Sequence, residues 1–391
     1  MRSGIKQRGI VLALMLVLAL VAAACSSDSD ETTTTAEAPE ATTTTAEAPE
    51  ATTTTAGEPM ADAVKTCLVT DLAGVDDQSF NASAWKGVQD AVAAGYATED
   101  STYLESADAT DWQPNVDLFI NQGCQHIVTV GFALGEVTAI NAEANPDIIW
   151  TMVDNVLTDE NFAPLALPNV RELVYQTDEA AFAAGYLAAG MTQTDTLCTY
   201  GGANFPTVSI FMDGFARGAE HYNEVKGTNV EVKGWDIDAQ DGLFTGSFTD
   251  MELARSTAQS LFDEGCDMII PVGGAINLPA GDVILESGID AAMIGVDADA
   301  YFAMEAKYQP VWLTTVEKAI APFVTLAVQE QVEGTWTAGS FKGTLANDGV
   351  GLSPYHDWDS RVPDELKAEV DQLLQDIKDG VVKAAFTPVG Y

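Results

Sequence analysis

Short apolar runs alternate with longer amphipathic segments through the chain beyond residue 62. Each run is followed by Gly, Asp or another turn-forming residue. Short buried runs of this kind are typical of parallel strands, and the amphipathic segments between them are typical of crossover helices. The pattern therefore predicts an α/β fold in which parallel sheets are covered by helices on both faces.

The predicted elements fall into two halves that repeat one plan. In the first half we expect helices at 79–95 and 112–122, and strands at 67–70, 102–105, 127–130 and 148–153. The second half begins near Asp178, with a helix rich in Ala and Gly. It precedes strands at 196–200, 230–235, 268–272 and 293–296, with helices at 206–223 and up to 264. Residues 311–318 are predicted to form a strand that passes into a helix at 315–318. Residues 363–378 are predicted to form a terminal helix.

Five residues stand just past the ends of predicted strands: Asp71, Gly131, Asp154, Gly274 and Asp297. Taken singly, each is an ordinary strand-terminating turn residue. Parallel strands present their carboxyl ends at one edge of a sheet, and small ligands bind there in α/β proteins. Together, the five residues predict a ligand cleft.

The N-terminus has the features of an exported lipoprotein. Arg2, Lys6 and Arg8 precede a nearly uninterrupted apolar run at 9–24, and small residues lead to Cys25. This order predicts a signal peptide over 1–24 and a diacylated Cys25. An uncleaved transmembrane anchor is the alternative, although the run is short for one. In either case we expect a protein that is exported and tethered to the membrane.

Residues 25–62 repeat the segment ETTTTAEAPE with a ten-residue period. They contain neither aromatic nor basic residues, so they cannot bury enough apolar surface to fold. We expect a disordered, solvated tether between the lipidated Cys25 and the folded part.

The folded part is strongly acidic. The chain has 17 Lys and Arg, three of them in the signal peptide, and 59 Asp and Glu, nine of them in the tether. This leaves 14 basic against 50 acidic residues, a formal charge of −36. Such a surface repels nucleic acid and free polyphosphates and favours neutral or cationic ligands. The length also exceeds that of one compact core and suits two lobes.

The other four cysteines occupy equivalent places in the two halves. Cys67 and Cys198 lie in the first strand of each half, and Cys124 and Cys266 each precede a later strand. Export permits disulfides, and adjacent parallel strands bring such positions together. We predict the pairs Cys67–Cys124 and Cys198–Cys266; four buried free thiols are the alternative.

Signs of catalysis or of a resident cofactor are missing from the sequence. His126, His221 and His356 have no partner at metal-ligand spacing, and no two cysteines have the C-x-x-C spacing. Neither a phosphate-binding GxxxxGK[ST] loop nor a GxSxG nucleophile elbow occurs. We therefore expect a binding protein without cofactor or metal, rather than an enzyme such as a secreted hydrolase.

The stretch from Thr70 to Trp85 contains the motif T-D-x-x-G-x-D-D-x-S-F-N-x-S-A-W. In this motif the chain resembles the basic membrane protein family, the nucleoside-binding lipoproteins of ABC importers similar to PnrA and TmpC. The resemblance implies a two-lobed type I periplasmic-binding-protein fold with a three-segment hinge, crossed near 176, 315 and 344. The N-terminal lobe would comprise 63–176 and 316–343, and the C-terminal lobe 177–315 and 344–391.

The resemblance also implies a set of ligand-binding residues. In the first lobe, Asp71 and Asn81 fall at polar contacts, Phe80 at a base-stacking position and Asp154 at the carboxylate that reads the base edge. In the second lobe, Phe248 would stack on the other face of the base, with Phe205 and Phe244 as alternatives. Three further residues complete the set: Gly274 as a backbone donor, Asp297 on the ribose and Lys318 on the sugar.

We expect a monomer, lipid-anchored on the extracytoplasmic face of the cell membrane, that captures a purine nucleoside and passes it to an ABC permease. A binding protein for another neutral polyol such as a sugar, or an extracellular ligand sensor, is the alternative. Two features depart from the family pattern. Glu317 is placed to pair with Lys318 and weaken its part in binding, and Asn204-Phe205-Pro206 is an unusual sequence after the Gly pair.

Overall fold

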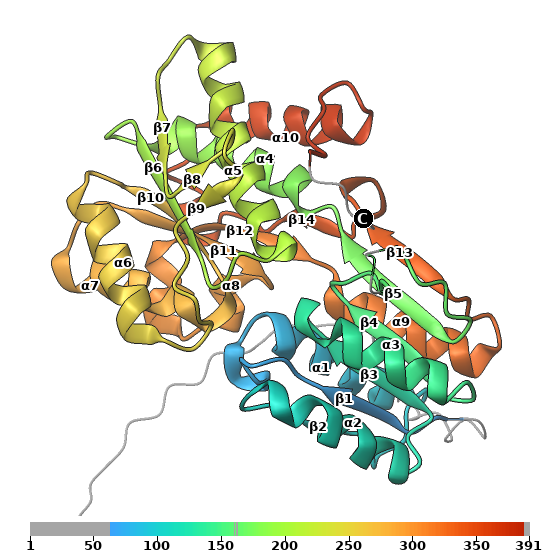
Figure 1. The fold of residues 1–391 in the computed structure, drawn as a ribbon. Coiled ribbons are helices and arrows are strands. Elements are labelled where there is room, and N and C mark those ends of the chain that lie inside the picture. Colours follow the sequence, from blue (N-terminus) through green and yellow to red (C-terminus); the bar gives the residue numbers. More distant parts are fainter. Residues whose placement is uncertain (1–62, 160, 162, 387–391) are drawn as a thin grey trace, which may run out of the picture. The chain divides into compact units, whose positions relative to one another are not determined.

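The computed structural model describes residues 63–159, 161 and 163–386. The predicted signal peptide, Cys25 and the tether lie outside the described residues. Within this described part, the chain forms two lobes, each built on a six-stranded sheet (Figure 1). The α/β fold with two lobes predicted from the sequence is confirmed.

The two sheets have equivalent strand orders, so the two halves repeat one topology. The first sheet runs β13-β5-β4-β3-β1-β2 and contains β1 (Thr66–Val69), β2 (Thr102–Leu104), β3 (His126–Val130), β4 (Ile149–Val153), β5 (Val170–Tyr175) and β13 (Gly339–Gly343). The second runs β14-β12-β11-β10-β6-β7 and contains β6 (Thr196–Gly201), β7 (Glu231–Lys233), β10 (Met268–Val272), β11 (Ala292–Asp297), β12 (Trp312–Lys318) and β14 (Val350–Leu352). All neighbours are parallel except β12 and β14. A separate antiparallel ribbon pairs β8 (Trp235–Asp236) with β9 (Asp241–Gly242).

Helices cover both faces of each sheet. The first lobe has α1 (Phe80–Ala93), α2 (Trp112–Asn121), α3 (Gly135–Ala144) and α9 (Ile320–Glu333). The second has α4 (Thr177–Met191), α5 (Pro206–Lys226), α6 (Met251–Asp263), α7 (Leu278–Ser287), α8 (Ala300–Ala303) and α10 (Asp364–Lys378). Single 3-10 turns occur at η1 (Val75–Asp77), η2 (Ala109–Asp111), η3 (Phe132–Leu134), η4 (Gly274–Asn277), η5 (Ala306–Val311), η6 (Leu345–Asn347) and η7 (His356–Trp358).

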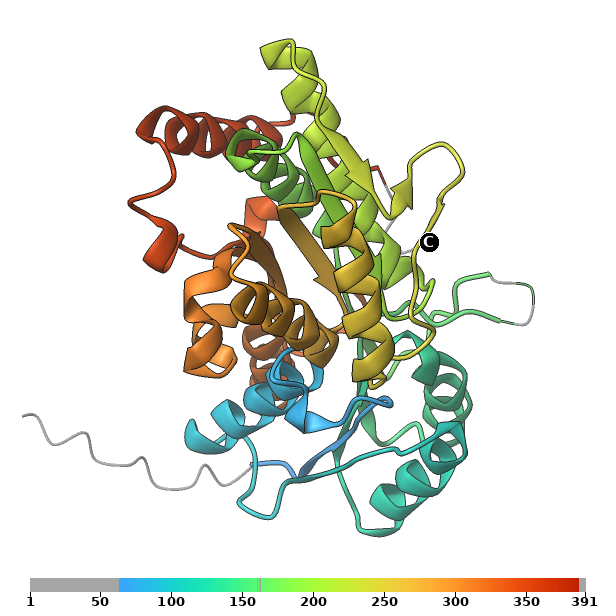
Figure 2. The same ribbon diagram turned by 90° about the vertical axis from the view of Figure 1, so that its left-hand side faces the viewer.

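Side-chain alternation along β1 explains this layering. Leu68 packs in the core formed with α1 and α9, whereas Cys67 and Val69 point to the opposite core, formed with α2 and α3. Figure 2 shows α1 and α2 on opposite sides of the first sheet. Because every side chain of central strands such as β1, β3 and β10 is buried on one face or the other, these strands form nearly continuous apolar runs in the sequence.

The chain passes between the lobes three times. It leaves the first sheet after Tyr175, returns after Lys318 and leaves again after Gly343. In Figure 1, α9 and β13 lie beside the elements of the first sheet, although they are distant from most of them in sequence.

The predicted helix start at residues 315–318 is wrong. β12 continues to Lys318 because it pairs with β11 up to Asp297 and with β14 up to Val350. Helix α9 begins only at Ile320, so the second crossing follows Lys318 rather than lying near 315.

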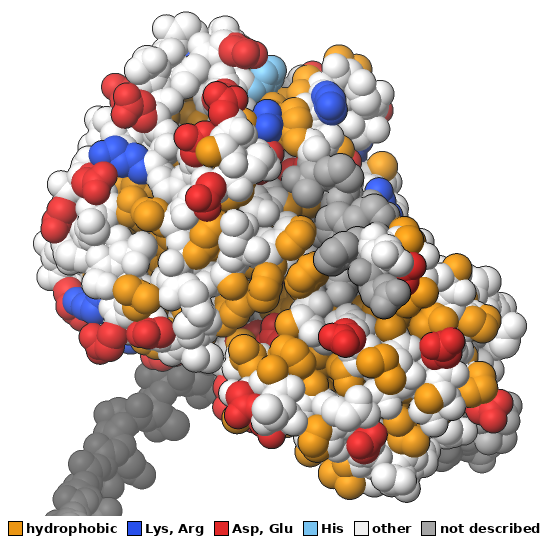
Figure 3. All heavy atoms as spheres, in the orientation of Figure 1, with side chains coloured by type: hydrophobic (Ala, Val, Ile, Leu, Met, Phe, Trp, Pro, Cys, Tyr) orange, Lys and Arg blue, Asp and Glu red, His pale blue; other side chains and the backbone are white. Residues whose placement is uncertain are grey.

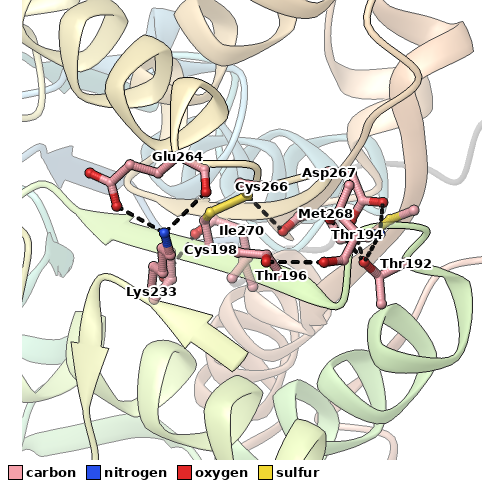
Figure 4. Close-up of a disulfide and its surroundings, with 11 residues drawn as sticks. Thr192, Thr194, Thr196, Cys198, Lys233, Glu264, Cys266, Asp267, Met268 and Ile270 are labelled. Carbon is pink, nitrogen blue, oxygen red and sulfur yellow. Dashed lines mark hydrogen bonds and ion pairs between the residues drawn. A yellow bond between two sulfur atoms is a disulfide. The ribbon is translucent and has the colours of Figure 1, made fainter. Parts of the chain in front are cut away.

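Each lobe contains one disulfide, in the pairing predicted from the sequence. Cys67 is joined to Cys124 and Cys198 to Cys266, with Cα atoms 6.0 Å apart in both pairs. Figure 4 shows the second disulfide beside Asp267, whose carboxylate accepts hydrogen bonds from the Thr192 hydroxyl at 2.6 Å and the Thr194 backbone at 3.2 Å. The disulfide joins β6 to the turn before β10, and Asp267 in the same turn accepts these partly buried hydrogen bonds.

The surface agrees with the acidic composition. On the face shown in Figure 3, Asp and Glu side chains are spread over both lobes and Lys and Arg are few. Hydrophobic side chains on that face gather where the two lobes meet.

Candidate ligand-binding site

The carboxyl ends of strands from both lobes surround a cavity of about 310 Å³. This volume lies at the lower end of the range for small-molecule sites. The structure places all eight ligand-binding residues predicted from the sequence around it: Asp71, Phe80, Asn81, Asp154, Phe248, Gly274, Asp297 and Lys318. Their roles in binding stay predictions.

In the first lobe, Asp77 organises the start of α1. Its buried carboxylate accepts hydrogen bonds from the backbone of Ser79 (3.0 Å), Asn81 (2.8 Å) and Ala82 (3.0 Å). The Asn81 amide then donates to Asp77 at 3.0 Å and to Asp71 at 2.7 Å. Ionised carboxylates only accept hydrogen bonds, so the Asn81 NH2 group, and not its oxygen, must face the two aspartates.

Asp71 has one carboxylate oxygen committed to the protein. Oδ1 accepts from Asn81 and from the backbone of Ala73 at 3.1 Å. Burial raises the pKa of Asp71 to about 6, and the hydrogen bonds from Asn81 and Ala73 offset part of that rise. Gly131, with φ 102°, lies against this carboxylate, since a Cβ there would come within 2.8 Å of Asp71 Oδ2.

Lys318 joins two aspartates at the other end of the cavity. Its Nζ lies 2.6 Å from Asp154 and 3.5 Å from Asp297, and all three side chains are at most 7% exposed. Burial acts to lower the pKa of Lys318, but the two carboxylates outweigh it and leave that pKa above its ordinary value. Burial also raises the pKa of Asp154, and Lys318 only partly offsets this. The two carboxylates therefore explain the direction of the shift for Lys318, whereas burial is the main cause for Asp154.

Asp154 and Asp297 occupy equivalent positions in the two lobes. Asp154 follows β4 and Asp297 ends β11, and both have left-handed backbones, with φ of 64° and 68°. In this conformation the chain turns sharply where the strand ends. The two carboxylates thus reach Lys318 from opposite lobes.

Aromatic rings form much of the remaining wall. Lys318 Nζ lies 5.4 Å from the centroid of the Phe80 ring and 4.8 Å from that of Phe211. Phe205 lies between Phe132 at 5.3 Å and Phe248 at 6.1 Å. A base or another flat ring would therefore meet aromatic surface from both lobes.

The structure distinguishes among the three aromatics considered for the second stacking face. Phe248 and Phe205 line the cavity, whereas Phe244 packs against Trp235, with ring centroids 6.5 Å apart. Phe248 rests on glycine backbone, since a Cβ at Gly202 would lie 2.3 Å from its ring.

Three aromatic wall residues were not among those predicted: Trp112, Phe132 and Phe211. Phe132 directly follows Gly131, which ends a predicted strand, so its place at the cavity could have been predicted from the sequence. Phe211 lies on the buried face of α5, and the apolar pattern of that helix does not distinguish a cavity wall from a core.

Within the described residues Glu317 does not form the ion pair with Lys318 that the sequence suggested. Neighbouring strand residues point to opposite faces. The side chain of Glu317 lines a second hollow, outside the cavity, which Asp299 and Lys318 also border. Burial, and then Asp299, raise the pKa of Glu317, whereas His356 lowers it.

Two kinds of feature are absent from the described residues. In residues 63–159, 161 and 163–386, no group of three or more His, Cys, Asp or Glu could hold a metal ion. None of the helices described is both long and apolar enough to span a membrane.

The two repeated lobes, the three crossings and the cavity between the strand ends define a two-lobed solute-binding protein of the type I periplasmic-binding class. A solute-binding protein from Aeropyrum pernix K1 has the same fold, with a TM-score of 0.71 at 21% identity over 83% of this chain and 93% of that one. One from Conexibacter woesei matches with a TM-score of 0.61, also at 21% identity, over 81% and 97% of the two chains.

The chain belongs to the family of PnrA-like ABC transporter substrate-binding proteins, whose model matches residues 64–384. The ABC transporter nucleoside-binding protein BmpA of Lactococcus lactis is 27% identical over 340 residues, which cover 82% of this chain and 86% of the relative. Basic membrane protein A of Borreliella burgdorferi is 26% identical over 316 residues, covering 80% and 85%. The protein is thus an ABC transporter substrate-binding protein, and this family membership agrees with the resemblance found in the sequence.

Proposed function

We propose that this protein captures a nucleoside between its two lobes, with a purine as the preferred base, and delivers it to an ABC permease. The observation that carries the proposal is the division of one cavity into an aromatic part and a charged part. The name of the Lactococcus relative, a nucleoside-binding protein, supports the same reading.

The charged part suits a ribose. Asp154, Asp297 and Lys318 together offer hydrogen-bond acceptors and a cation in a small buried space. Asp297 Oδ1 is buried and makes no hydrogen bond within the described residues, although it lies 3.5 Å from Lys318 Nζ, so a sugar hydroxyl could donate to it. A ligand without that hydroxyl would leave this oxygen without a hydrogen bond, which is the basis for discrimination.

The aromatic part suits a base. Phe80 on one side and Phe248 with Phe205 on the other would enclose it, and Asp71 with Asn81 would read its polar edge. Asp154 lies beside Lys318, so we assign it to the sugar rather than to the base edge implied by the family resemblance. Asp71 Oδ2 then becomes the acceptor for a ring or exocyclic N–H of the base.

The charge balance favours a nucleoside over a nucleotide. Asp71, Asp77, Asp154 and Asp297 line the cavity, and Lys318 is the one basic side chain among the described residues that line it. A phosphate would be repelled by several carboxylates in a low-dielectric site. A plain sugar would fit the charged part but would leave the aromatic part without a partner, and for this reason we favour the nucleoside.

Delivery would take place at the membrane. Arg2, Lys6, Arg8 and the small residues before Cys25 support export and lipid anchoring on the extracytoplasmic face, followed by a solvated tether. Such an anchor would keep the binding lobes near the permease. Mass spectrometry of the processed N-terminus tests this part, since diacylglycerol on Cys25 is expected and an intact signal peptide would contradict it.

Isothermal titration tests the ligand. The protein is unfolded and refolded to remove retained ligand, and is then titrated with adenosine, guanosine, inosine, cytidine and ribose. We expect saturable binding of a purine nucleoside with a Kd of about 1 μM or tighter, roughly −8 kcal/mol. No heat with any nucleoside from correctly folded protein would refute the proposal.

A matched pair of variants tests the stacking role. Phe248→Ala should weaken nucleoside binding by about 10- to 100-fold, the usual effect of losing one stacking face. Phe244→Ala serves as the control, because Phe244 lies on the same loop but does not line the cavity. Equal losses in the two variants would argue against stacking by Phe248.

A further inference from the structure

Ser79 makes a buried contact between the lobes. It lies in the first lobe, directly before α1, and its side chain reaches the end of β11 in the second lobe. The hydroxyl is 2.9 Å from the backbone oxygen of Val296 and 3.1 Å from Asp297 Oδ2. Both acceptors are in the opposite lobe, more than 200 residues away in the sequence.

The position of Ser79 would ordinarily serve a different purpose. A serine immediately before a helix typically caps it, by accepting a hydrogen bond from one of the first backbone N–H groups. Within the described residues the Ser79 side chain makes no such hydrogen bond to α1. Asp77 accepts from those backbone groups instead, at Ser79, Asn81 and Ala82. The hydroxyl of Ser79 is therefore available for a contact with the other lobe.

The backbone of the second lobe allows this close approach. Gly274 has a φ of 58°, which disfavours side chains, and a Cβ there would lie 3.7 Å from the Cβ of Ser79 and 3.5 Å from that of Asp77. The turn after β10 thus lies in van der Waals contact with the segment that carries Ser79. This steric contact is a second observation at the same point between the lobes.

We propose that Ser79 is a positioning residue that couples ligand capture to closure of the lobes. The inference rests on the proposed function, since it assigns Asp297 to the ligand. Asp297 would accept a hydrogen bond from Ser79 through Oδ2 and one from the ligand through Oδ1. The same carboxylate would thus hold the lobes together and bind the ligand. A ligand that orders Asp297 then favours the Ser79 contact, and the Ser79 contact in turn presents Asp297 to the ligand.

Dissociation kinetics test the coupling. Ser79→Ala should increase koff for inosine about fivefold, because one buried hydrogen bond that holds the lobes together is lost, while kon changes less than twofold. Ser83→Ala is the matched control, since Ser83 lies one turn along α1 and lines, together with Ser79, the hollow that also contains Glu317. Among the described residues, Ser79 and not Ser83 donates a hydrogen bond to Asp297. Equal koff values for the two variants would overturn the proposal.

Hydrogen exchange of the ligand-free protein gives a test that does not depend on nucleoside binding. Ser79→Ala should speed amide exchange in residues 295–299 of the second lobe as well as in 75–82 of the first. A purely local role in α1 would affect only the first segment, and that result would overturn the coupling. If wild-type protein binds no nucleoside, the proposed function fails, and the exchange data alone decide on the contact between the lobes.

Discussion

Replacing Lys318 with methionine should strongly destabilise the protein. The change keeps a side chain of similar length and removes the cation that Asp154 and Asp297 share. Removal of one partner from a buried ion pair typically costs 3–5 kcal/mol, because the remaining charge is left uncompensated. The three side chains are at most 7% exposed, so solvent screens the loss little. At pH 7.5 we expect the free energy of unfolding to fall by about 4 kcal/mol.

This loss should become smaller at lower pH. Without Lys318, burial and mutual repulsion would raise the pKa of a carboxyl group in the native variant, whereas an unfolded aspartate titrates near about 3.9. The native variant then binds a proton that its unfolded chain does not bind, so its stability rises as the pH falls. One such proton would recover up to about 2.7 kcal/mol between pH 7.5 and 5.5, at about 1.36 kcal/mol per pH unit.

Equilibrium urea unfolding at the two pH values measures both effects. Lys86→Met is the control, because Lys86 pairs with Asp90 on the surface, where its side chain is 61% exposed. That variant should lose no more than about 1 kcal/mol at either pH. A deficit for Lys318→Met below about 1 kcal/mol at pH 7.5, or a deficit that does not shrink at pH 5.5, would refute the reasoning.

Three further predictions concern other parts of the molecule. Because the pKa of Asp71 is raised to about 6, and the ionised form accepts a ligand N–H, inosine should bind about 10-fold more weakly at pH 5 than at pH 7.5, as followed by titration calorimetry. Removing the Cys67–Cys124 disulfide with a double alanine variant should lower the free energy of unfolding by about 2–5 kcal/mol in urea. Gly131→Ala should weaken inosine binding at least about 10-fold, because its new methyl group would displace the Asp71 carboxylate.

Each of these predictions has its own control. Asp71→Asn should abolish the pH dependence between pH 5 and 7.5, and a dependence that persists would point to another group. Alkylation without reductant should leave Cys67 and Cys124 unlabelled, and labelled thiols would contradict the disulfide. Gly123→Ala imposes a similar backbone strain, at φ 75°, with nothing within 4 Å, so it should spare binding.

The strand-end residues of the site could be predicted from the sequence. Asp71, Gly131, Asp154 and Asp297 follow or end apolar runs that predict buried strands, and parallel topology then brings their ends together. The same logic located the two cysteine pairs. For these features sheet geometry links the position in the sequence directly to the position in the fold, so one sequence is enough to predict them.

Other features depend on packing that the local pattern does not reveal. Whether Phe244 or Phe248 faces the cavity depends on the path of their loop, which pairs with β6 through backbone contacts of Gly201 to Leu243 and Thr245. Phe205 lies on a different segment, directly before α5. β13 also went unpredicted, because it is short and half-exposed and is a strand only through its pairing with β5. The second crossing was misplaced for a related reason, since β12 owes its last residues to its pairing with β14.

The left-handed backbone at Asp154 and Asp297 restricts which amino acids these two positions can accept. Branched or bulky side chains are strained in this conformation, whereas Gly, Asn and Asp tolerate it. Asparagine therefore keeps the turn while removing the charge, and glycine keeps the turn while removing the side chain. A library that aims to alter ligand choice without disturbing the lobes can be confined to these three amino acids at each position, which gives nine combinations.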